Sequence, residues 1–252
     1  MDAADATFVF CDGLLLVRAG GLEPAGAEAL PELQKTRAVL DDFVVRPQGC
    51  RAVGVAGAAD DPPTGCEWVR LRELLGAAAP QAATASRALG MLNWRAAHRF
   101  CSACGGALAE HPTETARICA ACGRVEYPNL APAVIVRVEK ENRILLARHV
   151  QRIPDLWTCL AGYVELGESL EECVRREVRE EAGIEVDDVR YVGSQHWPFP
   201  NQMMVGFRAR WTSGELKLQL EELAEARWFD PADLPKIPPK GSMAWRLIHE
   251  RI

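Results

Sequence analysis

The sequence predicts a mixed α/β protein with an N-terminal α+β domain, a small metal-binding module and a C-terminal α/β domain. Three observations support this division. Short apolar runs parted by turn residues fill positions 1–95, two Cys-x-x-Cys pairs fall within positions 96–127, and strand patterns alternate irregularly with helical patterns over 128–252. The length of 252 residues is sufficient for one large domain or two modest ones with an ordinary core.

The composition is that of a soluble globular protein, with 48% hydrophobic and 25% charged residues. The net charge of −6 and the sequence pI of about 5.5 disfavour broad electrostatic binding to nucleic acid, but they leave room for a local basic pocket for phosphates. No apolar run is long enough to span a membrane, and residues 1–20 lack the basic stretch of a secretory signal. Nine cysteines, five of them without regular spacing, fit a reducing compartment, so we expect a cytoplasmic protein without a membrane partner.

In the N-terminal region, the runs ATFVF and DGLLLVR predict strands separated by a turn. The stretches 60–65 and 76–86 are rich in Pro, Gly, Ala and small polar residues and predict loops. Residues 86–100 carry apolar side chains at helical spacing, which predicts a helix leading into the cysteines.

Four cysteines form a strong local signal: Cys101 and Cys104, then fourteen residues, then Cys119 and Cys122. Each Cys-x-x-Cys turn can direct two thiolates at one ion, and two turns complete a tetrahedral, structural site for Zn²⁺ with no open position. Two disulfides or a redox pair are weaker alternatives, since the compartment argues against the first and one pair would suffice for the second. The pairs are followed by glycines at positions where we expect a positive φ: Gly105, Gly106 and Gly123.

The C-terminal region begins with a predicted hairpin, in which runs 132–140 and 143–149 flank the polar turn residues 141 and 142. Runs 189–199 and 203–211 predict two further strands. Residues 243–252 predict a short final helix.

The segment between Glu168, at the junction with the preceding loop, and Gly183 predicts a helix whose acidic side chains do not all face solvent. At about 100° per residue, Leu170, Val174 and Val178 form an apolar stripe, and Glu177 and Glu181 fall inside that stripe. A carboxylate on a core-facing stripe is costly unless it is paired or binds a metal, and two of them one turn apart repel each other. Mg²⁺ or Mn²⁺ would remove the conflict, because both ions prefer carboxylate oxygen. The alternative is a helix rotated about its axis, with both acids reaching solvent.

The ends of this helix add to the metal interpretation. Glu180 falls on the edge of the stripe. Gly162 and Gly167 flank a loop before the helix, where we expect the backbone to be able to approach a phosphate. Gly183 occupies the position at which a helix commonly ends.

The segment 162–184 resembles the Nudix box at every defined position of that motif. The matching residues are Gly162, Glu168, Arg176, Glu177, Val178, Glu180, Glu181, Gly183 and Ile184. The resemblance implies a Nudix α/β/α sandwich with a mixed sheet, here preceded by a zinc ribbon and the N-terminal α+β domain. It also implies hydrolysis of a nucleoside diphosphate linked to another group, with Mg²⁺ or Mn²⁺ bound by the loop–helix–loop.

The resemblance extends to the NADH pyrophosphatase branch and covers the chain from about residue 90 to its end. A four-cysteine ribbon before the Nudix box is typical of that branch, and HRFCSACGG and YPNLAPAVIV are similar to its sequences. The segment 194–204, SQHWPFPNQMM, resembles the branch signature S-Q-P-W-P-F-P-x-S. The sequence departs from the branch at His196, Gln202 and Asn129.

The resemblance implies roles for individual residues. Glu177 and Glu181, a third carboxylate from Glu222, and the carbonyls of Ala161 and Ala244 would hold the divalent metal. Glu180 or Glu181 would accept a proton, Arg176 would position a carboxylate or form only a surface ion pair, and a homodimer is implied. The implied substrate-binding residues are Arg72, Tyr127, Gln195, His196, Trp197, Pro198, Phe199, Pro200, Asn201 and Gln202.

The signature has a physical rationale. Trp197 and Phe199 offer aromatic faces on which a base or nicotinamide can stack. Pro198 and Pro200 stiffen the segment, and Gln195 can hydrogen-bond an amide or a ring edge. The alternative for the same residues is a proline-rich core turn.

We therefore expect metal-dependent hydrolysis of the diphosphate of NADH or NAD⁺, giving nicotinamide mononucleotide and AMP, and removal of NAD caps from RNA by the same chemistry. Two alternatives stay open. One is a Nudix hydrolase acting on another nucleoside diphosphate derivative such as ADP-ribose, and the other is a non-catalytic zinc-ribbon regulator that senses a nucleotide. Intact acidic residues in the box and the acidic pI argue against the regulator.

Overall fold

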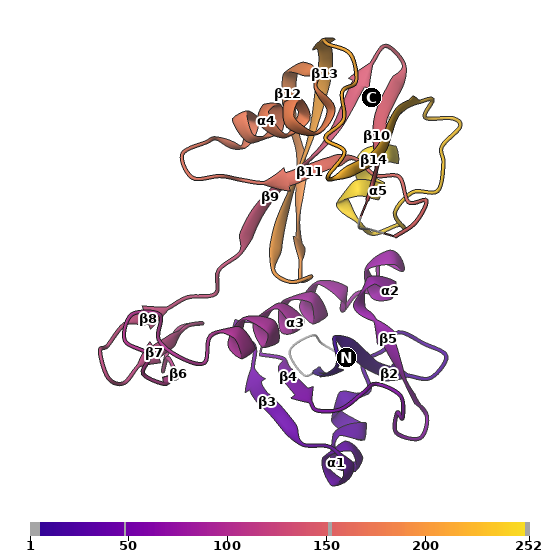
Figure 1. Cartoon of the computed structure of the whole chain (residues 1–252). Coiled ribbons are helices and arrows are strands. Elements are labelled where there is room, and N and C mark those ends of the chain that lie inside the picture. The colour runs from indigo at the N-terminus through magenta and orange to yellow at the C-terminus, as the bar shows by residue number, and fades with distance from the viewer. Residues whose placement is uncertain (1–5, 48, 151–152, 250–252) are drawn as a thin grey trace. The chain divides into compact units, whose positions relative to one another are not determined.

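The computed structural model describes residues 6–47, 49–150 and 153–249 (Figure 1). The chain divides into two compact units, one formed by Met1–Leu130 with Pro198–Asn201 and the other by Ala131–Trp197 with Gln202–Ile252. The short segment Pro198–Asn201 thus belongs to the first unit, although it lies within the C-terminal half of the sequence.

The first unit contains a five-stranded mixed sheet in the order β3-β4-β1-β2-β5, in which only β1 and β4 pair in parallel. Its elements are β1 (Thr7–Cys11), β2 (Leu14–Arg18), α1 (Gly26–Thr36), β3 (Val39–Val44), β4 (Arg51–Val55), β5 (Cys66–Arg70), α2 (Leu71–Gly76) and α3 (Ala82–Ala97). The predicted strands in ATFVF and DGLLLVR are confirmed as β1 and β2.

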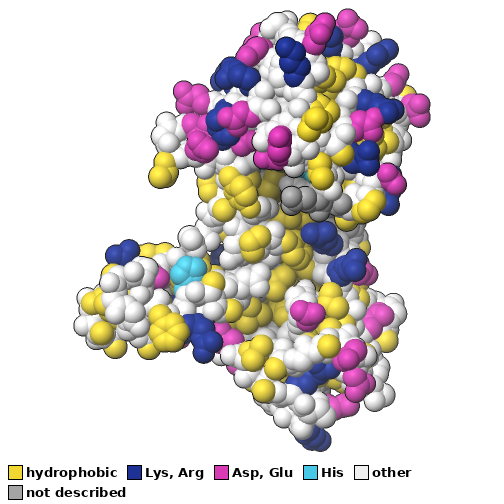
Figure 2. Space-filling view, in the orientation of Figure 1, with side chains coloured by type: hydrophobic (Ala, Val, Ile, Leu, Met, Phe, Trp, Pro, Cys, Tyr) yellow, Lys and Arg dark blue, Asp and Glu magenta, His cyan; other side chains and the backbone are white. Residues whose placement is uncertain are grey.

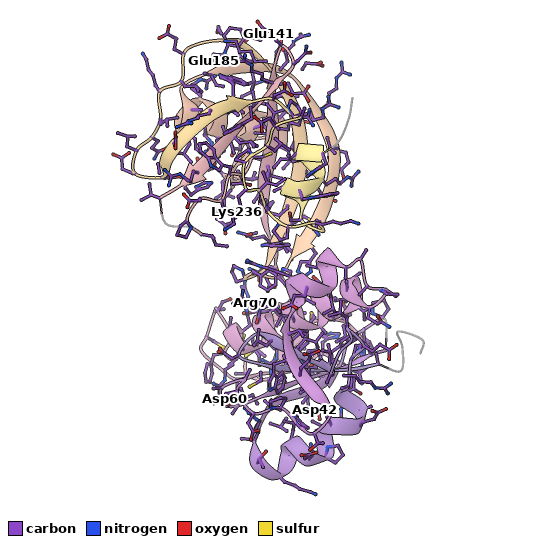
Figure 3. All side chains as sticks on the ribbon, turned by 90° about the vertical axis from the view of Figure 1, so that its right-hand side faces the viewer. Asp42, Asp60, Arg70, Glu141, Glu185 and Lys236 are labelled. Carbon is purple, nitrogen blue, oxygen red and sulfur yellow. The ribbon has the colours of Figure 1, made fainter. Side chains whose placement is uncertain are left out.

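Both faces of the sheet are covered by helices. Successive side chains of β1 point to opposite faces and pack in different apolar clusters. Phe8 and Phe10 pack in the cluster with α2 and α3, whereas Val9 and Cys11 pack in the cluster with α1. On the outer strand β3, Asp42, which is labelled in Figure 3, forms an ion pair with Arg51 of β4.

The predicted loop at 76–86 is wrong over its second half, because α3 begins at Ala82. Ala82 and Ala85 are buried against the sheet and α2. Alanine has the highest helix propensity, so an alanine-rich stretch beyond Pro80 extends the helix once its small side chains can pack.

The cysteine-containing module, also in the first unit, has a three-stranded antiparallel sheet of β6 (Leu108–Glu110), β7 (Arg117–Cys119) and β8 (Val125–Glu126). Its own buried cluster consists of Cys101, Leu108 and Cys119. Such a core is too small to stabilise a module alone, which is typical of metal-dependent folds.

The second unit is built on a six-stranded mixed sheet in the order β12-β13-β9-β10-β14, with β11 also paired to β9. Its elements are β9 (Ala131–Lys140), β10 (Arg143–His149), β11 (Leu160–Tyr163), α4 (Leu170–Ala182), β12 (Glu185–Trp197), β13 (Gln202–Ser213), β14 (Leu223–Phe229) and α5 (Met243–His249). Only β13 and β9 pair in parallel.

The two faces of this sheet are covered by different helices, which confirms the α/β/α sandwich. Val134 and Val136 of β9 pack in the cluster with α4, and Ile135 between them packs in the cluster with α5. The predicted hairpin is confirmed, since Arg143 pairs with Lys140 across a turn in which Glu141 has a φ of 56° (Figure 3).

The predicted final helix is confirmed as α5, but residues 250–252 of that prediction lie outside the described residues. Among the described helices, none combines the length and apolar character needed to cross a bilayer. On the face drawn in Figure 2, acidic and basic side chains are interspersed.

Candidate metal centres and active site

The four cysteines predicted to bind zinc converge. Their Sγ atoms all lie within 4.8 Å of one another, and three of the separations are 3.7, 3.5 and 3.5 Å. A Zn²⁺ ion bound tetrahedrally at about 2.3 Å requires sulfur atoms about 3.8 Å apart, whereas a disulfide requires about 2.0 Å. The donor set therefore fits a structural zinc ion and does not form disulfides.

The three glycines after the cysteine pairs serve two purposes, a left-handed backbone conformation and space for a sulfur atom. Gly105 and Gly123 each have a φ of 73°, as predicted. The prediction for Gly106 is wrong, because its φ is not in the left-handed region. A Cβ at Gly106 would lie 3.1 Å from Sγ of Cys119, so this glycine provides space for the sulfur cluster.

Helix α4 is held at both ends. The Ser169 side chain accepts a hydrogen bond from the Glu172 backbone, and the Glu172 carboxylate accepts one from the Ser169 backbone at 2.7 Å. Gly183 ends the helix in the left-handed conformation, with a φ of 69°. These caps fix where the helix begins and ends, and the packing of Cys173, Val174 and Val178 against the sheet fixes its rotation about its axis.

The predicted orientation of α4 is confirmed. Glu181 is only 2% exposed, the side chain of Glu177 is 12% exposed, and that of Glu180 is 54% exposed. The alternative of a rotated helix with both Glu177 and Glu181 in solvent is thereby excluded.

Gly162 lies near the end of β11, just before the loop that leads to α4, and it also packs closely against Glu177. It lies in β11 opposite Val134 of β9. A Cβ at Gly162 would lie 1.9 Å from Cδ of Glu177, so any larger side chain would displace that carboxylate. Gly167, with a φ of 96°, is the glycine that lies in the loop before α4.

Arg176 connects three carboxylates of this region. Its guanidinium donates to Glu168 at 2.7 and 3.0 Å, to Glu177 at 2.9 Å and to Glu180 at 3.0 Å. It also donates to the carbonyl of Tyr163 at 2.9 Å. The two bonds from Arg176 to Glu168, with one from the backbone of Glu165, lower the pKa of Glu168 to about 2. Arg176 therefore orients acidic groups in a network larger than a single surface ion pair.

Glu177 is under opposing influences. Burial raises its pKa above the usual glutamate value, the bond from Arg176 opposes that shift, and the negative charges of Glu180 and Glu222 add to it. The structure thus brings Glu222 within electrostatic reach of α4. Carboxylate oxygens are the donors that Mg²⁺ and Mn²⁺ prefer, so the chemistry of these side chains suits such an ion, although among the described residues only the four cysteines already converge closely enough to hold one.

Glu222 reaches α4 through the segment before β14. The backbone of Gln219 donates to the carbonyl of Glu181 at 3.1 Å, and its side chain donates to the carboxylate of Glu222 at 3.3 Å. Gln219 was not singled out by sequence reasoning, because only the folded chain brings this segment to the end of α4.

The residues implied as carbonyl ligands lie on two elements. Ala161 is in β11 and Ala244 is in α5, and both pack in the apolar cluster between the sheet and α5. Gln195 holds the start of α5, since its side chain accepts from the backbone of Met243 at 2.8 Å and donates to the carbonyl of Gly241 at 2.7 Å. The side-chain amide of Gln195 thus bonds within the second unit.

The signature residues divide between the two units. His196 and Trp197 are half-buried and end β12, paired with Met203 and Gln202 of β13. The Gln202 side chain donates to the hydroxyl of Tyr163.

By contrast, Phe199 packs against the N-terminal core, where the guanidinium of Arg72 lies 4.8 Å from its ring centre. The predicted residues Arg72 and Phe199 therefore meet, as a core turn would require. The prediction that Phe199 offers a stacking face stays untested.

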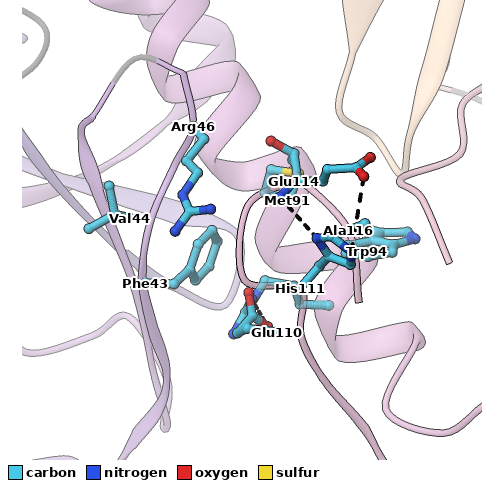
Figure 4. Close-up of a pocket in the computed structure, with 11 residues that line it drawn as sticks. Phe43, Val44, Arg46, Met91, Trp94, Glu110, His111, Glu114 and Ala116 are labelled. Carbon is cyan, nitrogen blue, oxygen red and sulfur yellow. Dashed lines mark hydrogen bonds and ion pairs between the residues drawn. The ribbon is translucent and has the colours of Figure 1, made fainter. Parts of the chain in front are cut away.

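A separate pocket of about 250 Å³ lies in the first unit, between β3, α3 and the segment 110–116 (Figure 4). Its polar lining is internally paired: Arg95 forms ion pairs with Asp41 and Glu110, and Glu114 accepts a hydrogen bond from Tyr127 at 2.7 Å. Tyr127, which we predicted to contact nucleotide, is 55% exposed beside this pocket.

Comparison with known proteins assigns the two C-terminal modules. Residues 128–249 match the Nudix domain family, and residues 96–127 match the NADH pyrophosphatase zinc ribbon domain. The chain belongs to the Nudix superfamily. Its zinc ribbon places it in the NADH pyrophosphatase branch.

Two curated relatives of this Nudix protein, from Salmonella heidelberg (strain SL476) and Salmonella typhi, are described as NAD-capped RNA hydrolase NudC. Each is 45% identical over 168 residues, which is 67% of this chain and 65% of the relative. The match therefore spans just under two thirds of each relative's length. A crystal structure of a Nudix hydrolase from Nitrosomonas europaea is 31% identical, covers 60% of this chain and 86% of its own, and has a TM-score of 0.49.

Several supporting residues of the Nudix domain escaped sequence reasoning. The capping box of Ser169 and Glu172 had a readable signal, since Ser-x-x-Glu before an apolar stripe predicts it. The contact between Gly162 and Glu177 had none, because it depends on the distance between β11 and α4 in the folded domain.

Proposed function

We propose that this chain hydrolyses the diphosphate of NADH or NAD⁺ and gives nicotinamide mononucleotide and AMP. The observation that carries the proposal is the packing of the Glu177 carboxylate against Gly162, beside the buried Glu181 and within reach of the charge of Glu222. The names of the curated relatives support the same substrate chemistry.

Glu177, Glu181 and Glu222 would hold Mg²⁺ or Mn²⁺ through carboxylate oxygens, together with carbonyl oxygens of Ala161 and Ala244. When bound, a divalent cation neutralises diphosphate charge and lowers the pKa of a coordinated water. Arg176 keeps Glu177 and Glu180 in fixed directions through its hydrogen bonds.

The reaction forms one phosphorus–oxygen bond and breaks another. The water oxygen attacks one phosphorus of the diphosphate, the bridging oxygen leaves with the second phosphate, and Glu180 or Glu181 accepts the proton of the water. Glu181 is buried whereas Glu180 is exposed and bonded to Arg176, so the two candidates differ in surroundings.

The same cleavage would remove an NAD cap from RNA, because only the diphosphate has to enter the site. We propose that Tyr127, His196 and Trp197 contribute to the recognition of the nucleotide. Arg72 and the remaining signature residues complete the set: Gln195, Pro198, Phe199, Pro200, Asn201 and Gln202.

The proposal includes an organisation of the chain into residues 1–95, a zinc ribbon at 96–127 and a Nudix domain at 128–252. It also includes a homodimer in the cytoplasm. Size-exclusion chromatography with light scattering measures the oligomeric state directly.

A hydrolysis panel tests the function. NADH, NAD⁺, ADP-ribose, diadenosine polyphosphates and NAD-capped RNA are each offered with Mg²⁺ and with Mn²⁺. We expect cleavage of NAD(H) only with added metal. Preferred cleavage of ADP-ribose would favour a hydrolase of changed specificity, to which the departures His196, Gln202 and Asn129 point. Nucleotide binding without hydrolysis would favour the sensing regulator.

A further inference from the structure

Four residues of the Nudix hairpin turn, Pro198–Asn201, belong to the same compact unit as the N-terminal sheet. The turn joins β12 to β13 and directly follows His196 and Trp197. Whatever fixes this turn therefore also limits the end of the strand that carries the signature residues.

Side-chain amides bind the turn to α3 in both directions. Nδ2 of Asn93 donates to the carbonyl of Pro198 at 3.1 Å and to the carbonyl of Pro200 at 3.3 Å. Nδ2 of Asn201 donates to the carbonyl of Gly90 at 3.2 Å. Both proline carbonyls flank Phe199, so a single side chain holds the backbone on either side of the aromatic ring.

Phe199 completes the anchor. Its ring packs against the N-terminal apolar cluster and lies under the guanidinium of Arg72 at 4.8 Å. The ring of Phe199 therefore anchors the turn to the first unit. Trp197, by contrast, belongs to the second unit.

From these contacts we infer that Asn93 is a positioning residue, which fixes the signature turn and thereby the recognition of the dinucleotide. The N-terminal sheet and helices would thereby contribute to substrate recognition. The kinetic test of this role rests on the proposed function, NAD(H) hydrolysis. No other type of side chain at 93 would match the arrangement easily, because two carbonyl oxygens require two donors from one short planar group.

Two variants and a control test the inference in the full-length protein. Asn93→Ala removes the amide, and Asn93→Asp keeps its shape but replaces both donors by acceptors. Arg87→Ala is the matched control, since Arg87 is also on α3 and bonds to the carbonyl of Arg46, away from the turn.

Hydrogen exchange measured by mass spectrometry reads the turn directly. We expect the backbone amides at the ends of β12 and β13, where Trp197 pairs with Gln202 beside the turn, to exchange about tenfold faster in both Asn93 variants, and at the wild-type rate in the control. Unchanged exchange in both variants would overturn the anchor, whether or not the wild-type protein hydrolyses NADH.

Kinetics with NADH then test whether Asn93 positions the signature turn for substrate recognition or only stabilises the fold. We expect KM to rise about tenfold in both Asn93 variants while kcat changes less than twofold. Faster exchange with unchanged KM would overturn the positioning role. If the wild-type protein cleaves no member of the hydrolysis panel, the proposed function fails, and the exchange rates alone still decide whether Asn93 anchors the turn.

Discussion

The cysteine cluster and the glutamate cluster are both sets of candidate metal ligands, but they are built in opposite ways. The four sulfurs come from two tight turns within residues 101–122 and gather in a module with a core of three residues. The glutamates come from α4 and from Glu222 beyond β13, and they are attached to a sandwich with large apolar clusters on both faces of its sheet.

The difference concerns what each metal would do. The cysteine module has little else to hold it together, so zinc there contributes to folding. The Nudix domain has its own core, and its carboxylates are directed by the packing of α4 and by Arg176. Loss of one ligand should therefore affect stability in the first region and chemistry in the second.

The largest effect is expected for Glu181→Gln. The variant keeps the size of a buried side chain and removes the charge that would bind the metal and activate water, so kcat for NADH should fall about 10²–10⁴-fold. The thermal unfolding midpoint should not fall. Glu171→Gln, an exposed change on the opposite side of α4, is the control and should keep wild-type activity. Full activity in Glu181→Gln would mean that the reaction occurs elsewhere.

The cysteine region should respond in the reverse way. Cys101→Ser should abolish the one zinc per chain measured by elemental analysis. It should also lower Tm by about 10 °C or more, because a structural zinc contributes several kcal/mol. Activity per folded molecule should persist. Cys66→Ser, at a half-buried cysteine outside the cluster, is the matched control. Freshly purified wild-type protein without zinc would refute the assignment.

The same contrast explains what the sequence could predict. Spacing sufficed for the zinc ligands, because each Cys-x-x-Cys turn is a local structure. Periodicity sufficed for the buried face of α4, because 100° per residue is a property of any α-helix. The contact of Gly162 with Glu177 could not be predicted, because it depends on how β11 packs against α4.

The partners of Gln195 and Phe199 depend on tertiary structure and cannot be predicted from their neighbours in sequence. The chemistry of Gln195 predicts a hydrogen bond to an amide or a ring edge, and in the fold its side-chain amide bonds to the backbone at the start of α5. Phe199 follows the signature of the branch, yet it packs against the N-terminal apolar cluster and Arg72, more than a hundred residues away in sequence. Donor and acceptor types can be read from a sequence, but their partners are fixed only by tertiary structure.

Gly162→Ala tests whether the glutamate cluster depends on close packing. A Cβ would have to move the Glu177 carboxylate, and overpacking of this kind costs about 1–3 kcal/mol. If that cost falls on the metal-bound state, the Mg²⁺ concentration for half-maximal activity should rise about tenfold to a hundredfold. Gly21→Ala is the control, because a Cβ there would lie 3.8 Å from the carbonyl oxygen of Arg18, an ordinary contact. An unchanged metal dependence would show that Glu177 does not bind the metal.

The smallest effect is expected for Glu168→Gln. The pH dependence of its stability tests whether the ion pair between Glu168 and Arg176 stabilises the fold. The pKa of Glu168 is lowered from 4.5 to about 2 by Arg176, so its interaction stabilises the fold above pH 4.5 and is lost as the pH falls toward 2. The variant should therefore melt a few degrees below wild type at pH 7, and the difference should shrink steadily between pH 4.5 and pH 2. Thermal unfolding followed by circular dichroism over this range measures the difference, with Glu165→Gln as the neighbouring control. A difference that stays constant down to pH 2 would mean that Glu168 supports α4 by packing and not through its charge.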